Sequence, residues 1–240
     1  ILEVKNLHFA YDEHHTVLDG ISLSVFAGER IAILGSNGAG KSTFFLNLNG
    51  VLTPAEGEIS YRGTKITRKT LKKLRQHIGI VFQDADNQII ASSVLAEVSF
   101  GPMNLKLPRS EVKKRVNTAL NYMNISQFKD RPPHYLSGGE KKRVSIADII
   151  AMKSEIIIFD EPTNGLDIVA TKDVEDYLIS LKNENKIILI STHIFSIIEK
   201  LCDKVAVILH GEKVLEGNLK ELTKEKSLSD IFFELYTEEE

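Results

Sequence analysis

The chain has 240 residues, a formal net charge of −3 and one cysteine. This length is enough to bury a full core, arranged as one large domain or as a core with a subdomain. The hydrophobic content of 42% and the charged content of 26% are typical of a soluble globular protein. Because basic residues are not in excess, the composition argues against nucleic acid as a partner. The single cysteine, Cys202, excludes an internal disulfide and fits a reducing compartment.

The sequence shows neither a membrane-spanning run nor a secretory signal. Its longest apolar runs, Ile187–Ile190 and Val205–Leu209, have the length of strands and fall short of the roughly 20 residues that a membrane-spanning helix needs. The sequence begins at Ile1 without a methionine, so we expect that a few residues precede it. Any role at a membrane is therefore expected to come through a partner.

The first third of the chain has the patterns of strands followed by one helix. Ile21–Val25 alternates apolar with polar residues, and Arg30–Leu34 is a short apolar strand that leads into a glycine-rich loop. Lys41–Leu48 is predicted to be a helix that stops at Gly50. Further strands are predicted over Leu2–Phe9, Gly57–Tyr61 and Ile78–Phe82.

The middle of the chain is predicted to be a helical insert, from about residue 87 to about residue 153. We expect a short helix over Val94–Phe100 that ends at Gly101–Pro102, because proline lacks the backbone N–H that a helix uses. A second helix, with apolar residues at helical spacing over Val112–Met123, is expected to begin at a Ser110 cap. A third helix is expected after a pair of glycines.

The last third alternates strands with helices. Strands are predicted at Ile156–Phe159, Ile187–Ile190 and Val205–Leu209, with helices between them. This alternation predicts an α/β fold with a mainly parallel sheet that helices cover on both faces. The core then comprises about residues 1–86 and 154–217. The charged tail, residues 218–240, is expected to be a solvated helix with a frayed end.

A glycine-rich loop separates the strand that ends at Leu34 from the helix that begins at Lys41. Gly35-x-x-x-x-Gly40-Lys41-Ser42 matches the phosphate-binding loop, and the flanking strand and helix supply the expected context. Glycines leave backbone N–H groups able to face phosphate oxygens, and a helix N-terminus favours an anion. Lys41 would bring a charge to the β- and γ-phosphates and Ser42 a hydroxyl ligand for Mg²⁺. The alternative is a chance glycine-rich turn. The residues expected to bind nucleotide here are Ser36, Asn37, Gly38, Ala39, Gly40, Lys41, Ser42 and Thr43.

Two acids follow the predicted strand Ile156–Phe159. A buried strand that ends this way delivers a carboxylate to the edge of the sheet where ligands bind. Asp160 would position hydrated Mg²⁺, and Glu161 would stand near the attacking water as a general base. The alternative is that both side chains only cap the turn that follows.

The segment Leu136-Ser137-Gly138-Gly139-Glu140 offers a hydroxyl and unobstructed N–H groups at a helix start, which is a second arrangement suited to phosphate. Since the phosphate loop already supplies one such arrangement, a second one points to contact with the nucleotide of another chain. The alternative is an ordinary helix N-cap.

The same segment resembles the signature of ATP-binding-cassette (ABC) ATPases, and the resemblance covers essentially the whole chain. It implies a P-loop NTPase, with a RecA-like core, an N-terminal antiparallel β subdomain and an inserted helical subdomain. It also implies that Tyr11 stacks on adenine, that Gln83 senses Mg²⁺ and the partner, that Asp167 anchors a loop crossing to the other subunit, and that His193 contacts the γ-phosphate. Ser137 and Gly139 would bind the ATP held by the partner chain. Structural alternatives exist for Tyr11, as a core tyrosine, and for His193, as a loop histidine.

By this resemblance the chain is an ATPase, converting ATP and water to ADP and phosphate, with two protomers packed head to tail around two ATP molecules. ATP and Mg²⁺ are the implied ligands. The partners would be an identical or sister ATPase and an integral membrane transporter subunit, with no nucleic acid, at the cytoplasmic face of the cell membrane. The surface over Asp84–Gln88, with Phe100, would receive a short helix of the membrane partner.

The segments Phe82–Ile89, Val94–Pro102 and Asn104–Pro108 resemble ATPases of energy-coupling-factor and cobalt- or nickel-type importers, which transport metal ions or vitamins. Ala85 departs from this pattern, because proline is usual there. The alternatives are an ABC exporter ATPase, or a non-transport ABC ATPase acting on nucleic acid or ribosomes. A phosphate-loop kinase or GTPase is a further alternative, which leaves Leu136–Glu140 unexplained.

Overall fold

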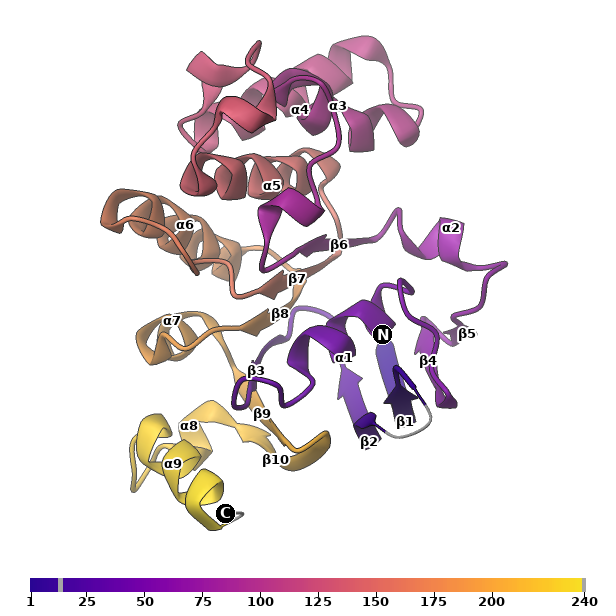
Figure 1. The fold of residues 1–240 in the computed structure, drawn as a ribbon, viewed down its shortest axis with the longest axis vertical. Coiled ribbons are helices and arrows are strands. Elements are labelled where there is room, and N and C mark those ends of the chain that lie inside the picture. Colours follow the sequence, from indigo (N-terminus) through magenta and orange to yellow (C-terminus); the bar gives the residue numbers. More distant parts are fainter. Residues whose placement is uncertain (13–14, 239–240) are drawn as a thin grey trace. The chain divides into compact units, whose positions relative to one another are not determined.

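The computed structural model describes residues 1–12 and 15–238. The chain forms two compact units, one made of Ile1–Arg75 with Leu181–Glu240 and the other of Gln76–Ser180 (Figure 1). The unit that contains both chain ends holds most of the strands, and the other unit is mainly helical. Subdomain boundaries near residues 87 and 153 stay a prediction.

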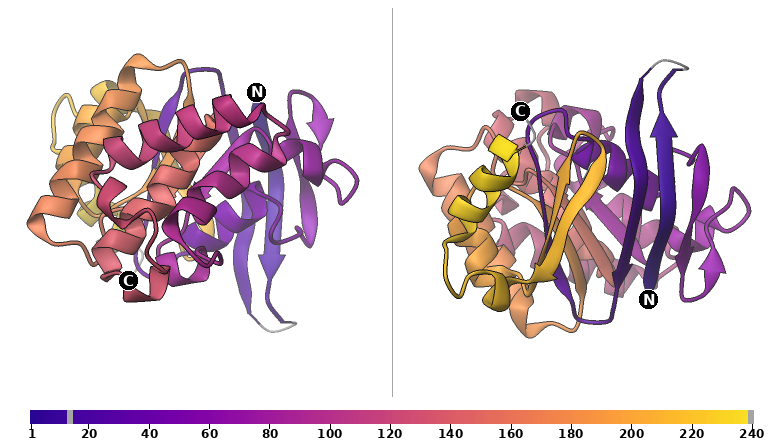
Figure 2. Two further views of the ribbon diagram at one scale, coloured as in Figure 1. Left: turned by 90° about the horizontal axis from the view of Figure 1, so that it is seen from above. Right: turned by 90° about the horizontal axis from the view of Figure 1, so that it is seen from below.

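The first unit begins with an antiparallel sheet. Its strands are β1 (Leu2–Ala10), β2 (Thr16–Val25), β4 (Glu56–Tyr61) and β5 (Thr64–Lys65), in the order β2-β1-β4-β5. β1 and β2 run side by side over most of their length (Figure 2). Val4 lies opposite Leu23 on one side and Ile59 on the other, and all three side chains are buried. The alternation of apolar and polar residues thus gives the sheet one buried face.

The same unit contains parallel strands that are buried on both faces. β3 (Arg30–Leu34) pairs in parallel with β8 (Ile187–Ser191) and with β9 (Lys204–Leu209), and β10 (Glu212–Asn218) pairs antiparallel with β9. The sequences of such strands are continuous aliphatic runs, because the side chains on both faces of the sheet are buried. The other elements of this unit are α1 (Lys41–Leu48), α2 (Leu71–Leu74), the 3₁₀ turn Leu181–Asn183, α7 (Phe195–Leu201), α8 (Leu219–Leu222) and α9 (Leu228–Glu238).

The second unit has two parallel strands and a helical layer. β6 (Ile78–Val81) pairs with β7 (Ile156–Asp160) in parallel. The helices are α3 (Val94–Asn104), α4 (Arg109–Tyr122), α5 (Gly138–Met152) and α6 (Ile168–Ser180), with 3₁₀ turns at Ala85–Asn87, Ser126–Phe128 and Pro133–Tyr135. Helix α5 packs against α3, α4 and β6 (Figure 1). The parallel strands, the N-terminal antiparallel sheet and the helical insert confirm the predicted α/β P-loop fold.

Two helix boundaries differ from the predictions. Helix α3 runs through Gly101 and Pro102 to Asn104. The proline stands in the last turns of the helix and is buried, so the helix loses a single backbone bond while the ring gains packing. Helix α4 begins at Arg109 with Pro108 as its N-cap residue, and the N–H groups of Glu111 and Val112 both donate to the Pro108 carbonyl. Ser110 therefore lies inside the first turn and is not the cap.

The tail also differs from the predicted solvated helix. It forms two helices, α8 and α9, and the first residues of both, Leu219 and Leu228, are buried. In α9 the Phe232 ring lies 6.3 Å from the Phe195 ring of α7. Apolar residues among the charges of the tail thus fix it to its own unit. The expected fraying of the end falls on residues 239–240, which lie outside the described residues.

Candidate nucleotide site

The phosphate loop joins β3 to α1 with a backbone that only glycine adopts easily. Gly38 and Gly40 have φ values of 84° and 100°. A Cβ atom on Gly40 would lie 2.8 Å from the Val17 carbonyl oxygen, and one on Gly35 would lie 2.2 Å from that of Ile208. A Cβ on Gly38 would meet nothing within 4 Å, so this side of the loop is open. The glycines therefore allow close packing behind the loop and access in front of it.

Lys41 is the first residue of α1, and its side chain folds back over the loop. The Nζ atom donates to the carbonyl oxygens of Gly35, at 2.8 Å, and Ser36, at 2.9 Å, and the residue is only 8% exposed. No side chain caps α1, because Gly40 occupies the N-cap position. Within the described residues the Ser42 hydroxyl makes no hydrogen bond. An open loop, an uncapped helix start and a buried ammonium together fit a phosphate group, and Ser42 fits as an oxygen ligand for Mg²⁺.

Tyr11 and His193 belong to the same unit as the phosphate loop. The Tyr11 hydroxyl lies 3.2 Å from the hydroxyl of Thr43, the third residue of α1's first turn, and the Tyr11 side chain is 61% exposed. It is therefore not a core tyrosine, and its ring is accessible for stacking. His193 is exposed and follows β8, the parallel neighbour of β3. Because parallel strands end at one edge of a sheet, His193 and the phosphate loop emerge at the same edge.

Gln83, Asp160 and Glu161 belong to the second unit. β6 and β7 are paired up to Val81 and Phe159, so Gln83 follows the carboxyl end of β6 and Asp160 is the carboxyl-terminal residue of β7. Gln83 is exposed, whereas Asp160 and Glu161 are 4% and 7% exposed. The structure thus brings the glutamine loop and the two acids to one edge of this strand pair, as the strand predictions require.

Lys142 is the residue at this edge that the sequence interpretation missed. It lies on α5, is 2% exposed, and its Nζ atom donates to the carbonyl oxygens of Phe82 and Gln83. Burial lowers the pKa of Lys142 to about 8, although the negative charges of Asp160, Asp84 and Glu161 oppose this shift. The spacing of Lys142 in the sequence could have predicted its burial. It lies three and seven residues before Ser145 and Ile149, so all three residues share the buried face of the helix.

Ser137 is the N-cap residue of α5 and forms a capping box with Glu140. The Ser137 hydroxyl accepts from the Glu140 N–H at 3.3 Å, and the Glu140 carboxylate accepts from the Ser137 N–H at 2.7 Å. Ser137 and Gly138 are exposed, and a Cβ on Gly138 would meet nothing within 4 Å. A hydroxyl that accepts one bond keeps its own proton to donate, so capping is compatible with phosphate binding. Gly139 is partly buried, with Leu166 and Ala170 nearest to where its Cβ would stand.

Asp167 stands before α6 and is exposed. Its carboxylate accepts a hydrogen bond from the Ala170 N–H at 2.7 Å, which is the contact of a helix cap. The two residues that follow, Ile168 and Val169, are 89% and 70% exposed. The start of α6 therefore presents two exposed apolar side chains next to an acid whose carboxylate is held by a backbone N–H.

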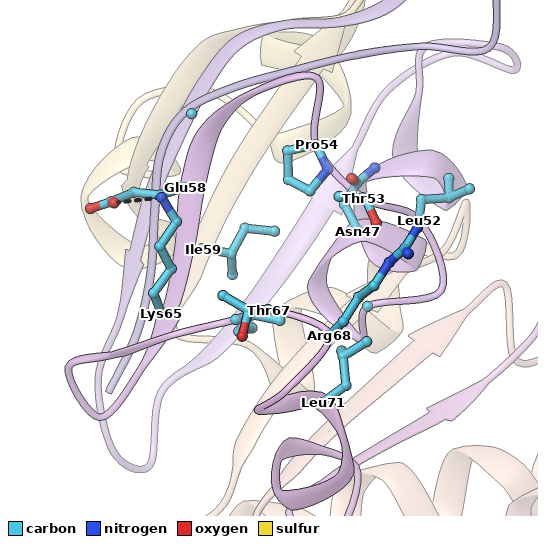
Figure 3. A pocket seen from close by; sticks show the side chains of 13 residues that line it. Asn47, Leu52, Thr53, Pro54, Glu58, Ile59, Lys65, Thr67, Arg68 and Leu71 are labelled. Atoms are coloured by element: carbon cyan, nitrogen blue, oxygen red, sulfur yellow. Dashed lines mark ion pairs between the residues drawn. The ribbon is translucent and has the colours of Figure 1, made fainter.

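A cavity of about 350 Å³ in the first unit lies away from these residues (Figure 3). Asn47 and Gly50, at the far end of α1 from the phosphate loop, line it together with Ile59 and Leu71. An ion pair between Glu58 and Lys65, 3.4 Å long, crosses two strands beside it. None of the predicted site residues lines this cavity.

In residues 1–12 and 15–238 no group of three or more His, Cys, Asp or Glu side chains is arranged to hold a metal ion. The same residues contain no helix that is long and apolar enough to cross a membrane.

A phosphate loop between a parallel strand and a helix, with a buried lysine closing over it, defines a P-loop NTPase. The family model described as ABC transporter matches residues 18–164. The energy-coupling factor transporter ATP-binding protein EcfA of Methanocaldococcus jannaschii is 46% identical over 224 residues, which are 92% of this chain and 80% of that protein. The chain belongs to the ABC transporter ATP-binding family and is close to its energy-coupling factor ATPases.

Solved structures agree with this assignment. The structure of cbiO1 from Clostridium perfringens, described as part of the ABC transporter complex cbiONQ, is 44% identical with a TM-score of 0.80, over 96% of this chain and 93% of that one. A dimeric bacterial ABC transporter cassette is 28% identical with a TM-score of 0.83, over 91% of this chain and 99% of that one. The predicted ABC ATPase fold and ATPase activity are therefore confirmed.

Proposed function

We propose that this chain is the ATP-hydrolysing motor subunit of an energy-coupling-factor-type importer of a metal ion, such as cobalt or nickel, or of a vitamin. The main support for nucleotide binding is the position of the Lys41 ammonium. The carbonyls of Gly35 and Ser36 hold it over an open phosphate loop. Phosphate oxygens offer this ammonium stronger, charge-assisted hydrogen bonds than carbonyls do. Tyr11 would stack on adenine, and residues 36–43 would surround the phosphates.

Within this proposal each acidic or polar residue has one task. Ser42, Gln83 and Asp160 hold Mg²⁺, directly or through its water. When bound, Mg²⁺ neutralises charge on the β- and γ-phosphates. Glu161 accepts a proton from the attacking water, and His193 contacts the γ-phosphate. Burial of Asp160 and Glu161 keeps bulk water away from their carboxylates, which strengthens their interactions with charge.

We infer that two protomers, identical or sister, share each ATP. Ser137 and Gly138 are exposed at the start of α5, and Ile168 and Val169 are exposed at the start of α6, next to Asp167. A hydroxyl, a helix N-terminus and an apolar rim suit a surface that closes on the phosphates held by another chain. A solved cassette that is 28% identical is described as dimeric.

The membrane partner is proposed to dock at the surface that follows Gln83. This surface carries exposed apolar side chains, since Ile90 is 78%, Phe100 56% and Met103 64% exposed. Phe100 and Met103 lie one helical turn apart on α3 and share a face. Exposed apolar side chains that lie together on one face are typical of interaction sites. The chain would then work as a peripheral protein at the cytoplasmic face of the cell membrane, without nucleic acid as a partner.

Affinity purification from detergent-solubilised membranes of the source organism tests this function. We expect an integral membrane protein to co-purify with the chain, and we expect Phe100→Ser to reduce its recovery. Phe233→Ser is the matched control, because Phe233 is 59% exposed but lies on α9 of the other unit. Equal recovery with both variants would exclude this docking surface. Recovery of no membrane protein with the unaltered chain would exclude the transport function.

A further inference from the structure

Lys142 is a buried charged residue on α5. Its residue exposure is 2%, and lysine is almost never fully buried unless it is paired. The Nζ atom donates to the carbonyl oxygen of Phe82 at 2.7 Å and to that of Gln83 at 2.8 Å. The burial of this ammonium is therefore compensated by two backbone acceptors that are adjacent in the chain.

Those two acceptors lie where the strand ladder ends. The register of β6 and β7 extends to Val81 and Phe159, and residues 82 and 83 lie just beyond it. Beyond the ladder these partly buried carbonyls have no neighbouring strand to bond, and the Lys142 ammonium supplies the hydrogen bonds instead. Lys142 therefore holds the backbone of the two residues that follow β6.

The lysine also connects two predicted functional elements. Ser137 is the N-cap of α5, and Lys142 lies five residues further along the same helix, a rise of about 7.5 Å. A rigid helix thus joins the Ser137 hydroxyl to the ammonium that holds the carbonyl of Gln83. The charge of Lys142 also interacts with Asp160, Asp84 and Glu161, which lie around the same loop.

Other contacts fix the rest of this loop but do not reach residue 83. The Phe82 N–H donates to Gln88 Oε1 at 3.2 Å, and Lys141 pairs with Asp86 at 2.6 Å. Further along, the Glu97 carboxylate accepts from the N–H groups of residues 90 and 91. Of these contacts, the one from Lys142 is the one that holds the backbone of Gln83 itself.

We propose that Lys142 is a positioning residue for the ATPase reaction, which fixes the backbone of Gln83 to the signature helix α5 so that Gln83 and Ser137 keep one arrangement. The inference rests on the proposed function, because it takes Gln83 and Ser137 as groups that act at ATP. A displacement of the loop by the membrane partner would, through this lysine, be passed to α5.

The test compares Lys142→Met with Lys142→Gln and with Lys141→Met. Methionine keeps an unbranched apolar chain but donates no hydrogen bond, whereas glutamine keeps two N–H donors without the charge. Lys141→Met makes the same chemical change one residue away, where the lysine pairs with the exposed side chain of Asp86. We expect Lys142→Met to lower kcat about 10–100-fold, since small misplacements of catalytic groups have effects of this size. The KM for ATP should stay within about threefold, and the Mg²⁺ concentration for half-maximal rate should rise.

A second readout does not depend on activity. In the nucleotide-free protein, amide hydrogen exchange of residues 82–88 should become faster in Lys142→Met, while α4 keeps its protection. Lys142→Gln should recover at least about a third of the wild-type kcat, and Lys141→Met should stay within about twofold of wild type. Should Lys142→Met fail to fold, exchange and Mg²⁺ dependence are measured on Lys142→Gln, which keeps donors without the charge and should show smaller changes in the same direction.

Three results would overturn the inference. These are unchanged exchange and kcat in Lys142→Met, an equal loss in Lys141→Met, or no recovery in Lys142→Gln. Each is distinct from failure of the proposed function. That failure would appear as absent hydrolysis by the wild-type chain, or as undiminished hydrolysis by Glu161→Gln.

Discussion

Glu161 has a backbone conformation that side-chain-bearing residues rarely adopt. Seven non-glycine residues among those described have positive φ, and Glu161, with φ of 45°, is the buried one. The other six are exposed and lie in turns, at helix ends or, for Asn6, at a shift in strand register. A conformation of this kind costs about 1–3 kcal/mol and persists where the surroundings fix it, which is common at active sites. The strain directly after β7 therefore supports a specific placement of this carboxylate.

We predict that Glu161→Gln lowers kcat for ATP hydrolysis by a factor of about 10²–10⁴, the usual contribution of a positioned general base. Glutamine has nearly the same shape, so the dissociation constant for ATP should change by less than about threefold. Phosphate release and equilibrium binding of a fluorescent ATP analogue measure the two effects.

The control for this change is Glu155→Gln, which alters an acid at the other end of the same strand, where Glu155 pairs with His77. It should hydrolyse ATP at close to the wild-type rate. A Glu161→Gln variant that turns over at the rate of the Glu155→Gln control would show that Glu161 is not the base.

Asp148 is a second acid in an unusual environment, on the buried side of α5. Its Oδ1 atom is buried without a hydrogen-bond partner, and burial, with a smaller contribution from the charge of Glu97, raises the pKa of Asp148 to about 7. The folded protein therefore binds this proton more tightly than the unfolded chain does. Between the unfolded pKa near 3.8 and about 7 the unfolded state holds fewer protons, so stability from this group falls as pH rises and then levels off.

We predict that Asp148→Asn, which cannot ionise, becomes more stable than wild type as pH is raised from 5 to 8. About two units of the shift from 3.8 to about 7 lie above pH 5, so the gain over this range is at most about 3 kcal/mol. Urea unfolding at several pH values measures it, with Asp130→Asn in an exposed loop as the matched control. A difference between Asp148→Asn and wild type that does not change over this range would contradict the assigned protonation.

At the scale of elements, helix α5 begins with a residue to which we assign two tasks. Ser137 caps the helix, and we propose that it also donates to the ATP of a partner chain. Ser93 offers a matched comparison, because its hydroxyl caps α3 by accepting from the Ala96 N–H at 3.2 Å. Replacement of either cap by alanine should cost about 0.5–2 kcal/mol of stability.

We predict that Ser137→Ala and Ser93→Ala lose similar unfolding free energy, whereas Ser137→Ala alone loses most of the ATP turnover. ATP binding to a single protomer should be unaffected in both, because the phosphate loop is intact. Chemical unfolding and phosphate release separate the two tasks. Equal turnover in both variants would leave Ser137 with capping alone.

The elements that the sequence predicted well are those with a strong local signal. Ile156–Ile158 and Ile187–Ile190 are aliphatic runs of strand length, and the glycines of the phosphate loop have no substitute at their φ values. Pro102 led to a wrong prediction of where α3 ends. The free-energy cost of a proline in a helix depends on its position, and near a helix end the packing of its ring outweighs the loss of one backbone hydrogen bond. Lys142 was missed since its burial requires two carbonyls from a segment 59 or more residues away in the chain. Local patterns carry no information of that kind.

At the scale of the whole molecule, the site residues are divided between the two compact units. The phosphate loop, Tyr11 and His193 belong to the first unit. The second unit holds five residues to which a role in binding Mg²⁺, in activating the water or in binding the partner's ATP is assigned, namely Gln83, Asp160, Glu161, Ser137 and Gly139. Ser137 and Gly138 are exposed, as a contact with another chain requires. If two protomers share each ATP as proposed, the rate of hydrolysis per protomer should depend on protein concentration.

We predict that ATP converts Glu161→Gln from a monomer to a dimer in analytical ultracentrifugation, because bound ATP remains unhydrolysed between the protomers, whereas ADP leaves it monomeric. The double variant Glu161→Gln with Ser137→Ala should stay monomeric with ATP, since the contact of the partner with the phosphate is lost. For the wild-type chain, the rate per protomer should fall on dilution as the dimer dissociates. A rate per protomer that stays constant at every dilution, in a preparation that sediments only as a monomer, would rule out a shared site.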